Sequence, residues 1–482
     1  MNPDQSPSNS KDTKNIDFKS STDFVTPSLF LFIDNILVSL GGWIFWLVIS
    51  KLATASEVGL AVTVYSLVML VTTITQLGLE YPLLKKSSIS GSKILGTTFL
   101  IESVVTLASI PFIFIFMNVV YEESVEQFTW LSIGLLVILS LEFVFRFALL
   151  GVSNSKIVMI IDLIGVMIKM LTGFVLVSLS FGTVGILLAY LFEGFFVFFS
   201  SLYFVHKSLG FGLGNFRFFK ETIEDALINT PAKWSKMVIV ILGVVLLSLF
   251  SVSASDVGIF YVSLMITLVV ASFASSMAYM VIPSSNIYKK DLSSGGLRLS
   301  LSLTTPIVVV LLVASGPVLS LIGKEYESAE SILIVLAMAI IPMSITVNLI
   351  SKLNNLNKSK TLIITGFIQL VTFFVCFLIL VPIYGTMGAA ISILVTYIIS
   401  SIFLVLISDR SSFRWILSAC FSILAGFAAS YVLGAITGYQ HQLLITVFGV
   451  AVSLVSIFLS KSMTVEETSL LIKGMIQKKY LL

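Results

Sequence analysis

Seven ionisable residues lie inside long apolar stretches of this sequence, where a charge is costly and therefore marks a pathway or a paired site. Two are cations, Arg146 and Lys169. An arginine can donate two parallel hydrogen bonds to a phosphate, and a lysine offers a compact point charge. The other five are the carboxylates Asp34, Glu102, Glu142, Asp162 and Glu193, and a buried carboxylate can take up a proton or a sodium ion.

Two interpretations of these charges stay open. Glu142 and Arg146 are one helical turn apart and can pair along one helix face, and Asp162 and Lys169 also share a face. Arg146 therefore fits a charge-balanced structural pair as well as a phosphate-binding group. Counting from the predicted helix ends places two residues near the middle of the membrane, Lys169 and Glu193. The same count places four toward the cytoplasmic side, Asp34, Glu142, Arg146 and Asp162. This arrangement predicts a polar vestibule that opens inward.

The elements that must position these residues are membrane-spanning helices. The 482 residues are 57% hydrophobic and 11% charged, and the mean hydropathy is +1.07. A span needs roughly 20 apolar residues. We predict about fourteen spans, at 28–50, 58–79, 94–117, 128–150, 157–180, 184–206, 234–252, 257–282, 298–322, 330–350, 362–381, 388–407, 415–437 and 441–461. The segments do not alternate polar and apolar residues as barrel strands do. The predicted fold is therefore all-α.

The distribution of Lys and Arg predicts the orientation, because cytoplasmic loops retain these residues. A cytoplasmic N-terminus puts all but three of the 28 Lys and Arg residues inside. The exceptions are Lys51 and Lys324 in outer loops and Lys169 within a helix. Both termini are then cytoplasmic, and the expected location is the cell membrane.

The sequence contains an internal duplication. Residues 55–60 (ASEVGL) recur as 254–259 (ASDVGI), and residues 181–185 (FGTVG) recur as 384–388 (YGTMG), at nearly the same spacing. Each unit holds an even number of helices, so the halves insert in the same sense and are related by an axis along the membrane normal.

We therefore divide the chain into six parts. They are a polar cytoplasmic tail (1–27), a first lobe of six helices (28–206), a cytoplasmic amphipathic linker (207–233), a second lobe of six helices (234–407), two further helices (408–461) and a cytoplasmic amphipathic tail (462–482). The linker is predicted to be a surface helix because Phe219, Ile223 and Leu227 follow helical spacing among charged residues.

Three stretches resemble the polysaccharide biosynthesis, or Wzx-type, flippases of the multidrug/oligosaccharidyl-lipid/polysaccharide (MOP) exporter superfamily. They are 50–59 running on to 76–79, 322–329, and 381–390. One departure is 246–251 (LLSLFS), where many members carry a charged pair. The resemblance implies two six-helix lobes around a cavity. It also implies movement of a polyprenyl-linked glycan to the outer leaflet by alternating access.

In that case Arg146 and Lys169 are expected to bind the phosphate groups of the substrate. Asp34, Glu193, Glu102, Glu142 and Asp162 are the acids that could face the cavity or couple transport to H⁺ or Na⁺. The second lobe offers mainly Asn348 and Gln369. Expected partners are the lipid-linked glycan, membrane lipids and other polysaccharide-assembly proteins. No nucleic acid, cofactor or metal is expected.

Two alternatives remain. A multidrug exporter of the same superfamily would share the lobes but move free amphipathic compounds. A membrane glycan polymerase, ligase or glycosyltransferase is disfavoured because every predicted outer loop is short. The sequence has no Gly-x-x-x-x-Gly-Lys-Ser/Thr motif, so direct use of ATP is not expected.

Overall fold

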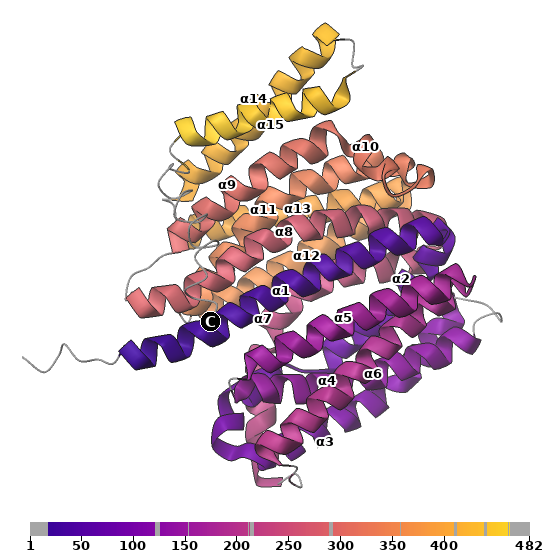
Figure 1. Cartoon of the computed structure of the whole chain (residues 1–482), viewed down its shortest axis with the longest axis vertical. Helices are drawn as coiled ribbons and strands as arrows, with labels where there is room; N and C mark the ends of the chain where they lie inside the picture. The colour runs from indigo at the N-terminus through magenta and orange to yellow at the C-terminus, as the bar shows by residue number, and fades with distance from the viewer. Residues whose placement is uncertain are drawn as a thin grey trace, which may run out of the picture.

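The chain folds into long α-helices packed side by side (Figure 1). The computed structural model describes residues 18–120, 126–152, 154–210, 212, 216–288, 293–356, 358–408, 412–437, 441–460 and 462. The helices of the first half are α1 (Phe18–Leu52), α2 (Ala55–Thr75), α3 (Glu80–Val120), α4 (Glu126–Gly151), α5 (Ser155–Ser178) and α6 (Gly182–Leu209). Those that follow are α7 (Phe216–Leu249), α8 (Ala254–Tyr288), α9 (Ser293–Val313), α10 (Ser315–Ser320), the 3-10 helix η3 (Lys324–Ala329), α11 (Glu330–Asn355), α12 (Ser359–Tyr384), α13 (Thr386–Ser408), α14 (Phe413–Thr437) and α15 (Gln442–Leu459).

Thirteen of the described helices are long and apolar enough to cross a membrane, which confirms the predicted all-helical membrane fold. They match thirteen of the fourteen predicted spans. The remaining one, 234–252, lies largely in α7, which ends at Leu249, and the side chains of residues 228–240 lie outside the described part of the chain. The chain is therefore a multi-pass membrane protein.

The helices form two groups with equivalent packing (Figure 1). In the first group α3 packs on α4, α4 on α6 and α5 on α6, and in the second group α9 packs on α11, α11 on α13 and α12 on α13. Helices α1–α6 thus correspond in order to α7, α8, α9, α11, α12 and α13. Helices α14 and α15 pack on each other and on α9, at the edge of the second group.

The two groups meet through a symmetric set of helices. Helix α1 packs on α8, α2 packs on α7, and α2 packs on α8. Because α1 corresponds to α7 and α2 to α8, the first two contacts are equivalent and the third lies on the axis between the groups. The duplicated hexapeptides are the first turns of α2 and α8, so the two copies of the repeat face each other there.

Equivalent caps begin these two central helices. Thr54 accepts a hydrogen bond from the backbone N–H of Glu57, and the Glu57 carboxylate accepts one from the backbone N–H of Thr54. At α8 the Ser253 hydroxyl accepts a bond from the N–H of Asp256 at 3.1 Å and donates to its carboxylate at 2.6 Å. Such a side-chain cap satisfies N–H groups that a helix start leaves open.

Two segments that lie between predicted spans are helical, and the second of them was predicted to be a helix. Residues 80–90 form a short arm of α3, which bends at Gly91 (φ 48°, ψ −126°), a conformation that glycine adopts without strain. The predicted linker, 207–233, lies largely in α7, which runs without a break into the seventh predicted span. The Nζ atom of Lys86 on the arm lies 2.8 Å from Oε1 of Glu221 on α7. The tail 462–482 lies outside the described residues, apart from Ser462.

The linker part of α7 contacts the first lobe on one face. Thr222 and Ala226 are buried, and Ile223 packs against the core of the first lobe. Phe219 and Leu227 are exposed. Of the three apolar residues predicted to lie on the membrane surface, Ile223 therefore packs against the protein, and Phe219 and Leu227 are exposed.

Candidate functional site

Arg146 on α4 joins three helices of the first lobe. Its Nε donates to Asp162 Oδ2 on α5 at 2.9 Å, and its Nη2 donates to Asp34 Oδ2 on α1 at 3.2 Å. Nη2 also contacts the Asp162 carboxylate. The two acids are buried, with side-chain exposures of 5% for Asp34 and 7% for Asp162, whereas the arginine is 27% exposed. We name these three residues the Arg146 cluster.

The pairing of Arg146 with Glu142 along α4, which the sequence left open, does not form a close ion pair in the part of the chain that the structure describes. Among the side chains that the structure describes, Arg146 pairs with acids on α1 and α5, and Glu142 is not one of its partners. The guanidinium fork reaches across the helix interface and binds two carboxylates that would otherwise be buried without a counter-charge. Glu142 lies one turn away on the same helix and is half-buried.

The Arg146 cluster holds one positive and two negative formal charges. In a low-dielectric interior such an excess of negative charge is unfavourable, and uptake of a cation would relieve it. The bonds to the acids use Nε and Nη2, and within the described part of the chain Nη1 makes no hydrogen bond. The cluster can therefore take up a proton or Na⁺ at its carboxylates and still present one donor to an anion.

Lys169 on α5 forms a second pair, with Glu193 on α6. Its Nζ donates to Glu193 Oε1 at 2.9 Å, and both side chains are largely buried. The ammonium also lies 4.7 Å from the ring centre of Tyr190 and 5.6 Å from that of Phe45, so aromatic faces stabilise the charge. The prediction placed Lys169 on one face with Asp162, but its partner is on the neighbouring helix.

The aromatic residues around Lys169 are the part of the site that sequence reasoning missed. Tyr65 on α2 stacks on Tyr190 with ring centres 4.0 Å apart. Trp46 on α1 makes an edge contact with Tyr261 on α8 at 5.0 Å, and α8 belongs to the second lobe. Aromatic residues are common in buried helices, so their spacing gave no signal. In the fold they connect the charged pair to the interface between lobes.

Glu102 on α3 is separate from both pairs. It is fully buried and accepts a hydrogen bond from the Thr75 hydroxyl on α2 at 3.1 Å and from Thr106 at 3.4 Å. In the second lobe the Asn348 amide donates to Ser300 at 3.1 Å, and Gln369 is buried. The predicted site residues thus divide into the Arg146 cluster, the Lys169–Glu193 pair, Glu102 and Glu142, all in the first lobe.

Two duplicated lobes with buried ion pairs beside their interface are features of membrane carriers. No family model matches the chain, and no curated protein matches it in sequence. Solved structures do match. One is "Lipid II flippase MurJ, inward closed conformation", with a TM-score of 0.71 and 16% identity over 94% of this chain and 100% of that one.

Two multidrug transporters have the same fold. One is an inward-facing MATE family transporter of the MOP superfamily, with a TM-score of 0.60 and 13% identity, and the match covers 82% of this chain and 95% of that one. The other is the MATE multidrug transporter DinF-BH, with a TM-score of 0.58 and 15% identity over 82% of this chain and 96% of that one. The chain therefore has the fold of these three transporters, which is the two-lobed helical fold that the resemblance implies.

Proposed function

We propose that this protein flips a polyprenyl-(pyro)phosphate-linked oligosaccharide from the cytoplasmic to the outer leaflet by alternating access, for the synthesis of a surface polysaccharide or glycoconjugate. The observation that carries the proposal is the extent of the structural match. The lipid II flippase matches over its whole length and covers 94% of this chain, whereas each of the two multidrug transporters covers 82%.

The first lobe supplies the chemistry that such a substrate needs. Arg146 is the more exposed of the two buried cations and keeps Nη1 for a phosphate oxygen. Lys169 lies about two helical turns after Asp162 on α5, roughly 10 Å away along the helix axis, where a second anionic group could reach it. The phosphate must compete with the carboxylates for both cations.

That competition supports ion coupling. When Asp34 or Glu193 takes up H⁺ or Na⁺, its negative charge is neutralised and its attraction to Arg146 or Lys169 weakens. The basic side chain then becomes available to phosphate. Release of the substrate on the other side would restore the ion pair and expel the coupling ion. Other polysaccharide-assembly proteins would supply and remove the glycan.

The alternating movement would take place at the lobe interface. The Lys and Arg distribution predicts that both termini are cytoplasmic and that α2 and α8 begin on the outer side. Contacts between the first turns of these two helices would then close the outer end of the molecule. Opening to the outside requires these helices to separate, which would also break the contact between Trp46 and Tyr261.

Multidrug export is the second candidate, and the excess negative charge of the Arg146 cluster favours it. Two buried carboxylates against one guanidinium would also attract an amphipathic cation.

A depletion experiment in the native cell separates the two functions. For a flippase, loss of the protein makes lipid-linked oligosaccharide accumulate in the inner leaflet and leaves sensitivity to cationic drugs unchanged. Increased drug sensitivity with normal lipid-linked intermediates would overturn the flippase proposal and support export.

A further inference from the structure

The stretch 322–329, one of the three that carry the sequence resemblance, has no part in the substrate site described above. It contains the 3-10 helix η3, which connects α10 to α11 in the second lobe. The outer surface of η3 is charged, and the side chains exposed there are Lys324, Glu325 and Glu327. On its inner side lies Tyr326, the largest side chain that is fully buried in the described part of the chain.

Tyr326 reaches from the second lobe to the first. The η3 helix packs on α8, and the residue before it, Gly323, approaches the last turn of α1. A Cβ atom on Gly323 would lie 4.0 Å from the carbonyl oxygen of Ser50. The Tyr326 hydroxyl lies beside the hydroxyl of the same serine. Because α1 belongs to the first lobe, this side chain bridges the two lobes at the end of the molecule where α2 and α8 begin.

Gly323 makes room for the tyrosine ring. A Cβ atom on Gly323 would lie 3.3 Å from Cδ2 of Tyr326, so a larger residue would displace the ring. The backbone N–H of Tyr326 donates a hydrogen bond to the Gly323 carbonyl at 3.1 Å. The glycine and this tight turn together fix the direction in which the tyrosine points.

The segment that carries Tyr326 is attached firmly to the second lobe. The Ser315 hydroxyl, at the start of α10, donates to Glu330 Oε1 at 3.1 Å and so connects α10 to the first turn of α11. At the end of α9 the Gln442 side chain of α15 donates to the Val313 carbonyl at 3.1 Å, a group that a helix end leaves open. We therefore expect η3 to move together with the second lobe.

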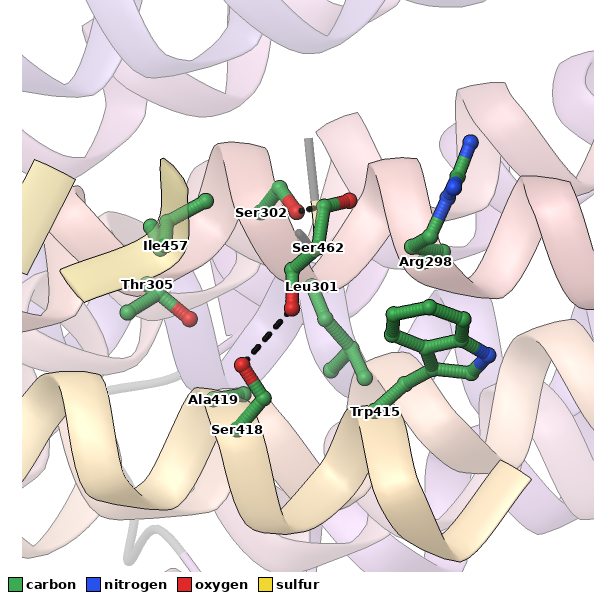
Figure 2. Close-up of a pocket in the computed structure, with 9 residues that line it drawn as sticks. All are labelled: Arg298, Leu301, Ser302, Thr305, Trp415, Ser418, Ala419, Ile457 and Ser462. Carbon is green, nitrogen blue, oxygen red and sulfur yellow. Dashed lines mark hydrogen bonds between the residues drawn. The ribbon is translucent and has the colours of Figure 1, made fainter. Parts of the chain in front are cut away.

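The last two helices hold α9 at its other end as well (Figure 2). The hydroxyl oxygens of Ser418 on α14 and Ser462 after α15 are 2.6 Å apart, and the Ser302 hydroxyl on α9 donates to the Ser462 carbonyl at 3.3 Å. Helices α9, α14 and α15 thus pack as one unit, and α10 and η3 extend from its far end.

Two buried hydroxyl groups oppose the contact between the lobes. The hydroxyls of Tyr326 and Ser50 lie near each other without a hydrogen bond of normal geometry, and neither has a partner among the residues that the structure describes. A buried polar group without a partner is unfavourable, and exposure to water would satisfy it. Packing of the ring therefore holds the lobes together, while the two hydroxyls favour separation.

We propose that Tyr326 is a gate residue, which holds the outer end of the lobe interface shut and is released when η3 and α1 separate. This role rests on the proposed alternating movement of the lobes, and it adds a side chain that sets how often the outer side opens. The predicted topology leaves Lys51 and Lys324, which flank the contact, on the outer side of the membrane.

The reactivity of a buried cysteine measures this opening. Thr63 on α2 is 1% exposed, and its hydroxyl lies 3.0 Å from that of Ser248 on α7, so a cysteine there reacts only when the lobes separate. Thr63→Cys is placed in the full chain together with Cys376→Ser and Cys420→Ser. A membrane-impermeant thiol reagent is added outside right-side-out membrane vesicles. The labelling rate requires no substrate.

Three variants of this reporter are compared. Tyr326→Ala removes the ring, and we expect Thr63→Cys to be labelled about tenfold faster. Tyr326→Phe keeps the ring but removes one of the two unpaired hydroxyls, so labelling should become about twofold slower. Tyr384→Ala is the matched control, because Tyr384 at the end of α12 is 56% exposed, and its rate should equal that of the unmodified reporter.

Equal labelling rates for Tyr326→Ala and Tyr384→Ala would overturn the proposal. So would labelling of Tyr326→Phe at or above the rate of the unmodified reporter, and this variant decides the question if thermal unfolding shows that Tyr326→Ala is not folded. A gate that fails this test leaves the flipping assay unaffected. Conversely, a protein that flips no lipid can still show these labelling rates, so failure of the gate and failure of the proposed function are separate results.

Discussion

Gly59 and Gly258 occupy the same position in the two copies of the internal repeat, and their backbones touch each other. A methyl group on Gly59 would lie 1.7 Å from the Ala254 carbonyl oxygen, and one on Gly258 would lie 2.2 Å from the Ala55 carbonyl oxygen. The contact is reciprocal because the two helices are related by the axis between the lobes. The duplicated sequence therefore forms the central contact between α2 and α8.

Replacing Gly59 with alanine should push α2 and α8 apart. The added methyl group collides with backbone, which cannot rotate away, so we expect a loss of stability of about 1–3 kcal/mol for this closed arrangement. The thermal unfolding temperature of the purified protein measures the effect. Gly42→Ala is the control, since a methyl group there meets nothing within 4 Å. Equal unfolding temperatures for the two variants would show that the contact is not tight.

A disulfide across the lobes should stop transport. The hydroxyl oxygens of Thr63 on α2 and Ser248 on α7 are 3.0 Å apart. Oxidation of a Thr63→Cys, Ser248→Cys double variant is expected to lock this end of the interface and abolish turnover, and reduction is expected to restore it. Each single variant provides the control. Full turnover with the disulfide formed would rule out separation of α2 from α7 as part of the cycle.

Removing Arg146 alone should be worse for folding than removing Arg146 together with one of its two acids. Arg146→Gln leaves Asp34 and Asp162 buried without their cation, and we expect a loss of about 3–5 kcal/mol. Adding Asp162→Asn removes one of the two acids, and the double variant should regain part of the wild-type stability. Expression level and thermal unfolding of the single and double variants measure this.

The same double variant separates structure from transport. If Arg146 binds the phosphate of the substrate, the double variant inserts stably but does not flip the substrate. Normal flipping by the double variant would show that the Arg146 cluster stabilises the fold and does not bind the substrate.

Neutralising the proposed coupling acids should stop flipping without loss of the inserted protein. We expect Asp34→Asn and Glu193→Gln to remove the groups that exchange H⁺ or Na⁺, so that an imposed ion gradient no longer drives turnover. Proteoliposomes with a proton or sodium gradient provide the measurement, and Glu57→Gln, at the start of α2, is the control for a change of charge. If both variants flip at the wild-type rate, these acids do not couple transport.

The helices and the duplication could be predicted from the sequence because both depend on local pattern. A span is visible as about 20 apolar residues, and the repeat was visible as residues 55–60 and 254–259. The reciprocal contact between Gly59 and Gly258 was not visible, since a glycine in a small-residue motif is compatible with many neighbours.

The partners of the buried charges could not be predicted for a related reason. Helical spacing along one chain segment pointed from Arg146 to Glu142, but the bonds that form run to Asp34 and Asp162 on other helices. Which faces of α1, α4 and α5 meet depends on the packing of the whole lobe. The continuous helix α7 was likewise divided in the prediction because its first half is polar and its second half apolar.

The most direct test of the proposed function is a flipping assay with purified protein. Proteoliposomes containing a fluorescent polyprenyl-diphosphate oligosaccharide are treated with a membrane-impermeant reagent that reacts only with outer-leaflet glycan. We predict that wild-type protein makes the inner-leaflet pool reactive, and that the oxidised Thr63→Cys, Ser248→Cys variant does so only after reduction. An inner-leaflet pool that stays unreactive with correctly folded wild-type protein, while a cationic amphipathic dye is transported, would contradict the account.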